Sequence, residues 1–253
     1  MQGLGLASRG QWSDAAECFL EARASQPDDV LYGLNLADAL MRVGQVERSL
    51  SVALECYAAE PDNRTALLMV VNARFQLGHF EQLVELLESA PAAWMDHDLW
   101  VRLGVAQFRT GRPQGSIASF LKALMERPAE ATAHYQLGVS FNEMAMKVEA
   151  AECFRTALVL GAGVLEVAIR NLLAFYEREV CQWHEGDDQV AQLRAAIGAL
   201  PDDAATQTNP FACVTLLDDP HAQLKASASC ARFFAGLVVR LRRVRPSTAV
   251  ASG

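Results

Sequence analysis

The segment HDLWVRLGVAQFRTGRPQGSIASFLKALMERPAE, residues 97–130, holds the pattern from which the architecture can be worked out. Apolar residues recur every three or four positions on both sides of Gly111, which predicts two amphipathic helices joined by a turn. Pro128 ends the second helix, because its ring cannot continue the backbone hydrogen-bond ladder. The fixed points of the pattern are Trp100, Leu103, Gly104, Gly111, Ser116, Phe120, Ala123 and Pro128.

The same spacing repeats along the chain. The turn glycines are Gly10, Gly44, Gly78 and Gly111, and the second-helix triplets are Ala15, Phe19 and Ala22, then Ser49, Ala53 and Cys56, then Ser116, Phe120 and Ala123, then Ala150, Phe154 and Ala157. One hairpin cannot bury its apolar face alone, so stacked units are expected, at 1–29, 30–63, 64–96, 97–130 and 131–164. The third unit lacks a closing proline at the expected position, although Pro91 lies nearby. The fifth unit has Ala145 where the turn glycine normally falls.

This 34-residue unit resembles the tetratricopeptide repeat, with its Trp-Leu-Gly and Ala-Phe-Ala-Pro skeleton. The resemblance covers residues 1–162 as five repeats and implies an all-α, right-handed superhelical solenoid with a concave groove lined by the first helix of each unit. Residues 163–179, GVLEVAIRNLLAFYERE, have a further amphipathic pattern and are expected to form a helix that caps the stack. A small, mainly helical C-terminal segment is expected to follow.

In that segment the 34-residue repeat stops at Val180, and residues typical of helix starts and helix ends follow. We predict a helix from Asp187-Asp188 to about Leu200, which Pro201 ends. A second helix is predicted to start at Asp219-Pro220, with the aspartate as its cap, and to run to about Phe234.

Residues 178–235 resemble the junction that precedes the catalytic region of O-linked N-acetylglucosamine transferases, including the SPINDLY type. The matching motifs are Cys181-Gln182-Trp183, Pro210-Phe211 and Asp219-Pro220-His221-Ala222-Gln223-Leu224. Trp183 and Phe211 are expected to be core anchors, since large aromatic side chains are usually buried. We divide the C-terminal part into 180–235, the linker and start of a transferase-like region, and 236–253, a basic and disordered tail.

The transferase resemblance implies a parent enzyme that moves N-acetylglucosamine from UDP-N-acetylglucosamine to Ser/Thr hydroxyls, with its repeats selecting protein substrates. The catalytic lobes of that family have no counterpart in this sequence. We therefore expect the chain to be inactive alone, with no catalytic residue, no cofactor and no metal site. The alternative is a free-standing, co-chaperone-like adaptor with no enzymatic ancestry, and the two hypotheses predict different resistance of residues 180–235 to limited proteolysis.

Composition and charge narrow the possible partners. Of the 253 residues 51% are hydrophobic and 21% charged, which is typical of a globular protein. The net charge is −8 and uneven, because residues 221–253 contain six basic and no acidic side chains. The acidic remainder argues against nucleic acid, and no apolar run approaches the roughly 18–20 residues that cross a bilayer. Six scattered cysteines and a start without signal-peptide features favour a cytoplasmic protein.

The concave groove is the expected site for a partner protein or peptide. In the transferase-type arrays an asparagine just before the Leu-Gly pair contacts an extended peptide, and an amide suits this because it donates and accepts at once. Asn35 and Gln136 keep an amide there, whereas the equivalents Met69, Arg102 and Arg170 do not. The predicted groove residues are Asn35, Asp38, Arg42, Asn72, Gln76, Arg102, Arg109, Gln136 and Asn142.

Two arginine features remain open to two interpretations each. Arg102 and Arg109 lie two helical turns apart, so they share a face and could clamp a carboxylate of the partner, or they could be solvated surface arginines. The tail contains Arg240, Arg242, Arg243 and Arg245. It could be a patch for anionic surfaces or an unordered chain end.

Overall fold

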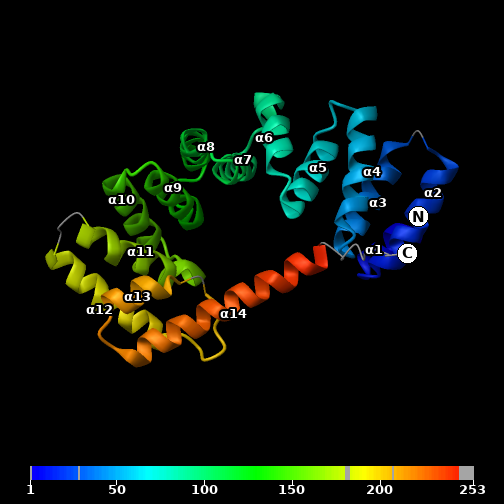
Figure 1. Ribbon diagram of the computed structural model, residues 1–253. Helices are drawn as coiled ribbons and strands as arrows, with labels where there is room; N and C mark the ends of the chain where they lie inside the picture. The colour runs from blue at the N-terminus through cyan, green and yellow to red at the C-terminus, as the bar shows by residue number, and fades with distance from the viewer. Residues whose placement is uncertain (1, 28, 180–182, 207, 245–253) are drawn as a thin grey trace, which may run out of the picture. The chain divides into compact units, whose positions relative to one another are not determined.

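The computed structural model describes residues 2–27, 29–179, 183–206 and 208–244, and of these the side chains of 183–187 and 238–244 are not described. Within these ranges every regular element is helical and no strand occurs, which confirms the all-α prediction. The chain divides into two compact units, Met1–Met95 and Asp96–Gly253, and each is described by itself (Figure 1). Cys181 and Gln182 of the Cys-x-Trp motif lie outside the described residues.

The first unit contains three helical hairpins. They are formed by α1 (Gln2–Ser8) with α2 (Trp12–Ser25), α3 (Val30–Arg42) with α4 (Val46–Ala59), and α5 (Arg64–Leu77) with α6 (Phe80–Ser89). The 3₁₀ turn η1 (Ala92–Trp94) follows α6. The second helix of the third hairpin is one turn shorter than α2 and α4, because Pro91 stands early and holds Ala90 in an extended conformation that ends the helix.

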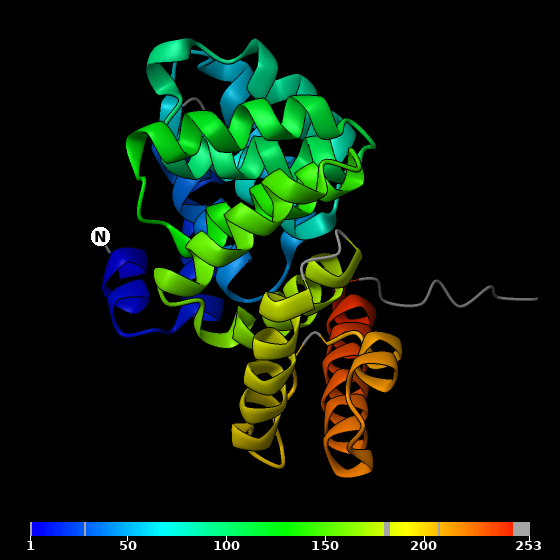
Figure 2. The same cartoon turned by 90° about the vertical axis from the view of Figure 1, so that its left-hand side faces the viewer.

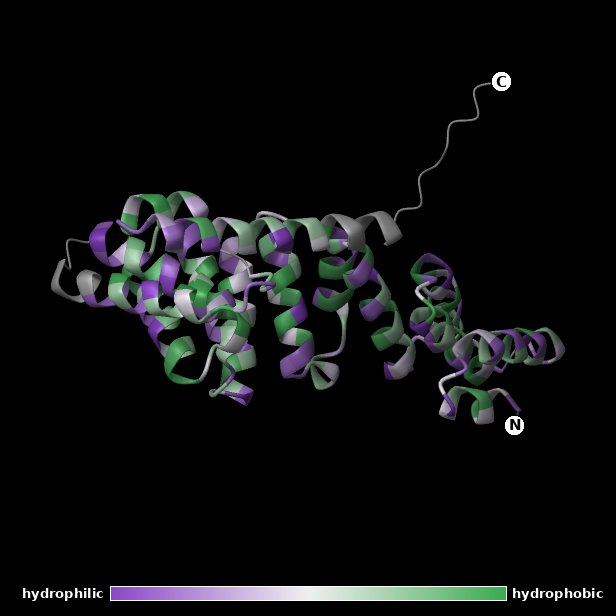
Figure 3. Cartoon of the chain, turned by 90° about the horizontal axis from the view of Figure 1, so that it is seen from below, coloured by the Kyte–Doolittle hydropathy of each residue, from purple (hydrophilic) through white to green (hydrophobic). Residues whose placement is uncertain are grey.

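The second unit contains three hairpins and a C-terminal pair of helices. The hairpins are α7 (His97–Arg109) with α8 (Pro113–Glu126), α9 (Ala131–Glu143) with α10 (Lys147–Val159), and α11 (Glu166–Glu179) with α12 (Trp183–Ala199). The 3₁₀ turn η2 (Gly163–Leu165) precedes α11, and α13 (Pro210–Leu216) and α14 (Pro220–Val244) end the described chain. Figure 3 shows hydrophobic and hydrophilic residues alternating along these helices, as amphipathic packing requires.

In the first, fourth and fifth hairpins a glycine of the first helix faces a phenylalanine that lies sixteen positions later on the second helix. A methyl group added to Gly104 would lie 2.9 Å from the Phe120 ring, and one added to Gly138 would lie 2.7 Å from the Phe154 ring. Ala37 and Ala53 form the matching pair in the second hairpin. The glycines therefore give the phenylalanine rings room to reach the opposite helix backbone.

The turns between paired helices use a left-handed residue. Gly44 and Gly111 have φ of +80° and +72°, and Ala145 occupies the same place in the fifth hairpin with φ of +58°. A residue with a Cβ is strained in this region, so the fifth turn carries a penalty that the glycine turns avoid.

The sixth hairpin corrects the expectation that the period ends at Val180 after a lone capping helix over 163–179. Ala174 and Val190 are sixteen residues apart and pack in one core cluster, the arrangement seen in the earlier hairpins. The second helix also starts nine residues after the small residue, at Trp183, as it does at Lys147 after Gly138. It is therefore a full helical hairpin, and the start expected at Asp187-Asp188 is four residues late. The periodicity hid it because Ala174 lies 36 residues after Gly138.

The C-terminal helices cover the sixth hairpin. Cys213 and Leu216 of α13 and Ala226 of α14 join the buried cluster of α11 and α12. Asp219 caps α14 as expected, accepting hydrogen bonds from the backbone amides of His221 and Ala222. Figure 2 shows α12 and α14 side by side, with α13 next to α14.

Two expectations about this segment are wrong. Phe211 is 73% exposed rather than a core anchor, because α13 turns Ala212, Cys213 and Leu216 inward. The helix that was expected to end near Phe234 continues to Val244, and residues 245–253 of the expected disordered tail lie outside the described residues. Gly236 disfavours helix by only about 1 kcal/mol, and the first residue that cannot extend the helix is Pro246.

Candidate functional site

The first helices of the hairpins form one layer in each unit, and this layer holds every predicted groove residue. Helix α3 packs on α5 in the first unit, and α7 packs on α9 in the second. We call the surface of these helices that faces away from the second helices the first-helix face. Since i, i+3, i+4 and i+7 positions share a helix face, the predicted residues of α3, of α5 and of α7 lie together on it, whereas Gln136 and Asn142 of α9 are six residues apart and do not share a face.

In the first unit the predicted residues of α3 form a charged pair beside an amide. Asp38 Oδ1 lies 3.6 Å from Arg42 Nε, and the Arg42 guanidinium lies 5.2 Å from the centroid of the Trp12 ring. Both charged side chains are exposed to solvent, so the pair stabilises the fold little and is available to a partner. Asn35, one turn before Asp38, is half-buried.

Helix α5 adds Asn72, which is half-buried, and Gln76, which is exposed. Within the described part of the chain, neither the Asn35 nor the Asn72 side-chain amide makes a hydrogen bond to another residue. An asparagine in a helix interior is unfavourable and usually gains from a local hydrogen bond. These two amides therefore remain able to donate to and accept from an added backbone.

In the second unit the two predicted arginines have different surroundings. Arg102 is half-buried, and burial lowers the pKa of its guanidinium while the charge of Asp98 opposes the change. Arg109 is exposed and lies near Tyr135 of α9, where its charge opposes the rise in pKa that burial causes for the phenol. Arg109 is therefore the more accessible of the two cations.

Helix α9 contributes Gln136 and Asn142, both half-buried. Neither side-chain amide is used in a hydrogen bond among the residues that the structure describes, and in this they match Asn35 and Asn72. Tyr135, which the sequence reasoning missed, is 8% exposed, packs against the Phe154 ring of α10 and lines a small cavity beside α11.

The C-terminal segment closes this face at α11. Asn171 donates a hydrogen bond to Cys213 Sγ at 3.1 Å, which holds α13 against α11. A small cavity of about 200 Å³ lies between α9, α11 and the segment before α13, lined by Tyr135, Ala168, Asn171, Leu172, Thr208 and Asn209. In the second unit a partner can therefore contact α7 and α9, while α11 is covered by the chain itself.

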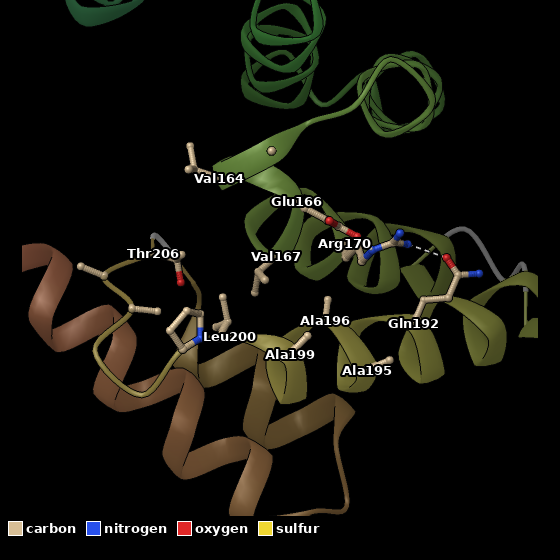
Figure 4. Close-up of a pocket in the computed structure, with 14 residues that line it drawn as sticks. Val164, Glu166, Val167, Arg170, Gln192, Ala195, Ala196, Ala199, Leu200 and Thr206 are labelled. Atoms are coloured by element: carbon tan, nitrogen blue, oxygen red, sulfur yellow. Dashed lines mark hydrogen bonds and ion pairs between the residues drawn. The ribbon is translucent and has the colours of Figure 1, made fainter.

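The register of the sixth hairpin also moves one assigned equivalence. Counting from Ala174 as the small residue, Leu172 occupies the place expected for Arg170. Arg170 instead forms an ion pair with Glu166 at 2.9 Å and a hydrogen bond to Gln192 of α12, so it belongs to the contact between the two helices of this hairpin (Figure 4).

A larger cavity of about 710 Å³ lies beside this ion pair, between α11, α12 and the loop after α12. Figure 4 shows that its walls are mostly short apolar side chains, among them Val167, Ala196 and Ala199. It is the part of the sixth hairpin that α13 and α14 leave uncovered. Its polar groups, Glu166, Arg170 and Gln192, are bonded to one another.

No described helix combines the length and apolar character needed to cross a membrane. Among the described side chains, His, Cys, Asp and Glu form no group of three or more that could hold a metal ion.

Comparisons with known proteins agree with this architecture. The tetratricopeptide repeat family matches residues 1–64 and 68–131, together just over half of the chain. Among solved structures, "MamA MSR-1 C2" is 28% identical, with a TM-score of 0.56 over 63% of this chain and 92% of its own. "MamA AMB-1 P212121" is 29% identical, with a TM-score of 0.59 over 64% of this chain and 96% of its own.

A more distant structure, "MamA 41-end from Desulfovibrio magneticus RS-1", is 21% identical with a TM-score of 0.59 over 62% of this chain and 90% of its own, and shows the same fold. No match was found among curated proteins. The family match, the stacked hairpins and these structural neighbours establish that the chain belongs to the tetratricopeptide repeat family and is an all-α solenoid protein.

Proposed function

We propose that this chain is a protein-interaction scaffold whose first-helix faces bind an extended partner peptide. One observation carries the proposal: the amides of Asn35, Asn72 and Gln136 lie half-buried on these faces, and none is used in a hydrogen bond within the described chain. A peptide backbone offers alternating donors and acceptors, which amide side chains match. Half-burial removes water from such bonds and strengthens them.

Charges on the first-helix face of the second unit favour an acidic side chain or terminus in the peptide that binds there. Arg102 and Arg109 supply two cations on α7, and a guanidinium can hold a carboxylate through two parallel hydrogen bonds. In the first unit Asp38 and Arg42 offer both signs. Since α13 covers α11, the peptide in the second unit is expected to end near Tyr135.

The test is a peptide library displayed on phage and selected against the intact chain. Selected peptides should bind the variant carrying Asn35→Ala and Asn72→Ala, and the variant carrying Gln136→Ala, at least about tenfold more weakly. Gln114→Ala, at an exposed amide of the second helix α8, is the matched control and should change nothing. Peptides that bind all three variants equally would show that the first-helix faces are not the site.

We further propose that this chain descends from a protein O-linked N-acetylglucosamine transferase. In that enzyme the first-helix faces would select the protein substrates. This proposal is supported by the motif order in residues 178–235 and the packing of this segment on α11, which is what a defined junction requires. The alternative is an adaptor without enzymatic ancestry. We expect no sugar transfer from UDP-N-acetylglucosamine by this chain alone, and detectable transfer would overturn that expectation.

Limited proteolysis separates these two finer alternatives. Protection of residues 183–235 together with α11 supports a junction that is part of the repeat stack. Rapid loss of the segment while α7 to α11 survive supports the adaptor.

A further inference from the structure

A groove lies on the second unit away from the first-helix face, where α8 and α10 flank the edge of α9. Its volume is about 540 Å³ and its surface is mainly apolar. The lining residues that matter here are Leu121, Met125, Leu137, Phe141, Val148 and Cys153. It contains none of the predicted peptide-binding residues, so it is separate from the proposed peptide-binding site.

Large apolar side chains are exposed at this groove. Leu121 is 46%, Met125 83% and Val148 62% exposed. Three exposed apolar side chains around one groove are more than the scattered single residues found on any protein surface, and such clusters mark interaction sites.

The groove is bordered by acidic side chains. Glu149 and Glu152 lie on α10 beside it and flank Cys153. The pKa of the Cys153 thiol is raised to about 11, mainly by burial, and the charges of Glu152 and Glu149 add to the rise. The border therefore favours a partner that brings positive charge next to apolar side chains.

The chain contains one segment with that chemistry, at the end of α14. In the sequence GLVVRLRRVRPS, residues 236–247, leucine or valine recurs at 237, 241 and 244, and four arginines fall between and after them. Apolar anchors at i, i+4 and i+7 are the pattern by which a helix lies in an apolar groove. Leu237, the first of these anchors, is 42% exposed.

This segment is directed away from its own groove. Hydrogen bonds from Lys225 to the Gly198 carbonyl and from Arg232 to the Ala204 carbonyl hold α14 along α12 and the loop that follows it. Figure 1 shows α14 starting beside α12 and α13, with its later part extending beyond them. The helix continues from there to Val244, so the groove it can fill is that of another molecule.

We infer that the basic apolar end of α14, residues 236–247, docks in the groove between α8 and α10 of a second copy of this chain. Groove and helix end are different surfaces, so the contact is head-to-tail, and each added copy presents a new groove and a new helix end. The expected products are dimers, trimers and longer species rather than one closed dimer.

The experiment is sedimentation velocity of the intact chain over a concentration series at low and high salt. The chain should associate as concentration rises, and salt should weaken the association because charges contribute to it. Val148→Asp in the groove, and Arg242→Glu with Arg243→Glu on the helix end, should each weaken it at least about tenfold. Val159→Asp, on the same helix α10 at an 87% exposed position outside the groove, is the matched control and should associate like the original chain.

Mixing and charge exchange test the geometry. The Val148→Asp chain mixed with the Arg242→Glu, Arg243→Glu chain should form a one-to-one dimer and nothing larger, because one intact groove meets one intact helix end. Glu149→Arg combined in one chain with Arg242→Glu and Arg243→Glu should recover association. All the substituted groove side chains are exposed, so unchanged circular dichroism should show that each variant folds.

Three results would overturn the inference. The intact chain could stay monomeric at every concentration. Association could survive both Val148→Asp and the arginine reversal. Finally, the chain could remain monomeric while vesicles containing phosphatidylserine retain it through the arginines, which would assign the helix end to a membrane surface instead.

Discussion

The fifth and sixth hairpins have the same register but divide the volume between their helices differently. In α9–α10 a glycine faces a phenylalanine, Gly138 with Phe154. In α11–α12 an alanine takes the place of the glycine and a valine that of the phenylalanine, Ala174 with Val190, sixteen residues apart in both cases. These two hairpins therefore share a small residue packed against a larger one at a fixed separation, and they do not share a particular pair.

The largest expected loss of stability comes from replacing the larger residue of each pair. Phe154 is fully buried, and its ring centroid lies 6.0 Å from those of Tyr135 and of Tyr176. Phe154→Ala should lower the free energy of unfolding by about 3–5 kcal/mol, since it opens a cavity among three helices. Val190→Ala removes two methyl groups and should cost only about 1.5 kcal/mol. Urea denaturation followed by circular dichroism measures both.

Equal losses for the two variants would contradict this division of volume. They would mean that the sixth hairpin depends on Val190 as strongly as the fifth depends on its phenylalanine. Val159→Ala, at an exposed position of α10, is the control for removing a valine side chain without burial and should stay within about 0.5 kcal/mol of the original chain.

The next largest change in stability is expected at the smaller residue of the pair in the fifth hairpin. A Cβ on Gly138 would stand 2.7 Å from a ring that has no room to move, so Gly138→Ala should destabilise by about 1–3 kcal/mol despite the better helix propensity of alanine. Phe154→Leu in the same chain should recover part of the loss, because it makes room for the added methyl group. If Gly138→Ala stabilises the protein instead, the ring yields easily and the glycine is not required by packing.

The residue types and spacing of these pairs explain which hairpins could be predicted from the sequence. Gly104, Gly138 and their phenylalanines stand 34 residues apart and are chemically distinctive, so the fourth and fifth hairpins were predictable from spacing. Ala174 and Val190 are common residues, and they lie 36 rather than 34 residues after Gly138 and Phe154. Only packing identifies them, so α11 was predicted to be a lone cap and α12 to start at Asp187.

The candidate site was predictable in part for the same reason. Position along a first helix placed Asn35, Asn72 and Gln136 on the first-helix face, because helical periodicity is local information. The burial of Arg102 beside Asp98 and the covering of Asn171 by Cys213 depend on other helices. The contact between α13 and α11 joins residues 42 positions apart, and no local pattern indicates it.

A smaller effect on stability is expected from the left-handed residue in the turn of each of these hairpins. Ala145 has φ of +58° where the fourth hairpin has Gly111 at +72°. Ala145→Gly should raise the free energy of unfolding by about 0.5–1 kcal/mol, because relief of the left-handed strain exceeds the added flexibility of the unfolded chain. Gly111→Ala meets no atom within 4 Å and should lower it by a similar amount through backbone strain alone. Two changes of the same sign would contradict this explanation.

The smallest effect concerns the thiols that pack in the two hairpins, and it changes stability only above about pH 9. Cys153 of the fifth hairpin and Cys213, which packs on the sixth, both have a pKa raised from 9.0 to about 11, mainly by burial. Because the folded pKa values lie above the unfolded ones, both thiols stabilise the fold fully below pH 9, and this contribution is lost as pH rises from about 9 to 11.

Alkylation by iodoacetamide, read by mass spectrometry at each cysteine, should distinguish them. Cys153 is partly exposed, so its rate should rise with pH as its thiolate forms, and Glu149→Gln should raise that rate by lowering its pKa. Cys213 is fully buried and should react only when α13 opens, so mild urea should accelerate Cys213 much more than Cys153. If urea accelerates the two thiols equally, α13 is no more than a loosely held helix, and the sixth hairpin is not closed by it.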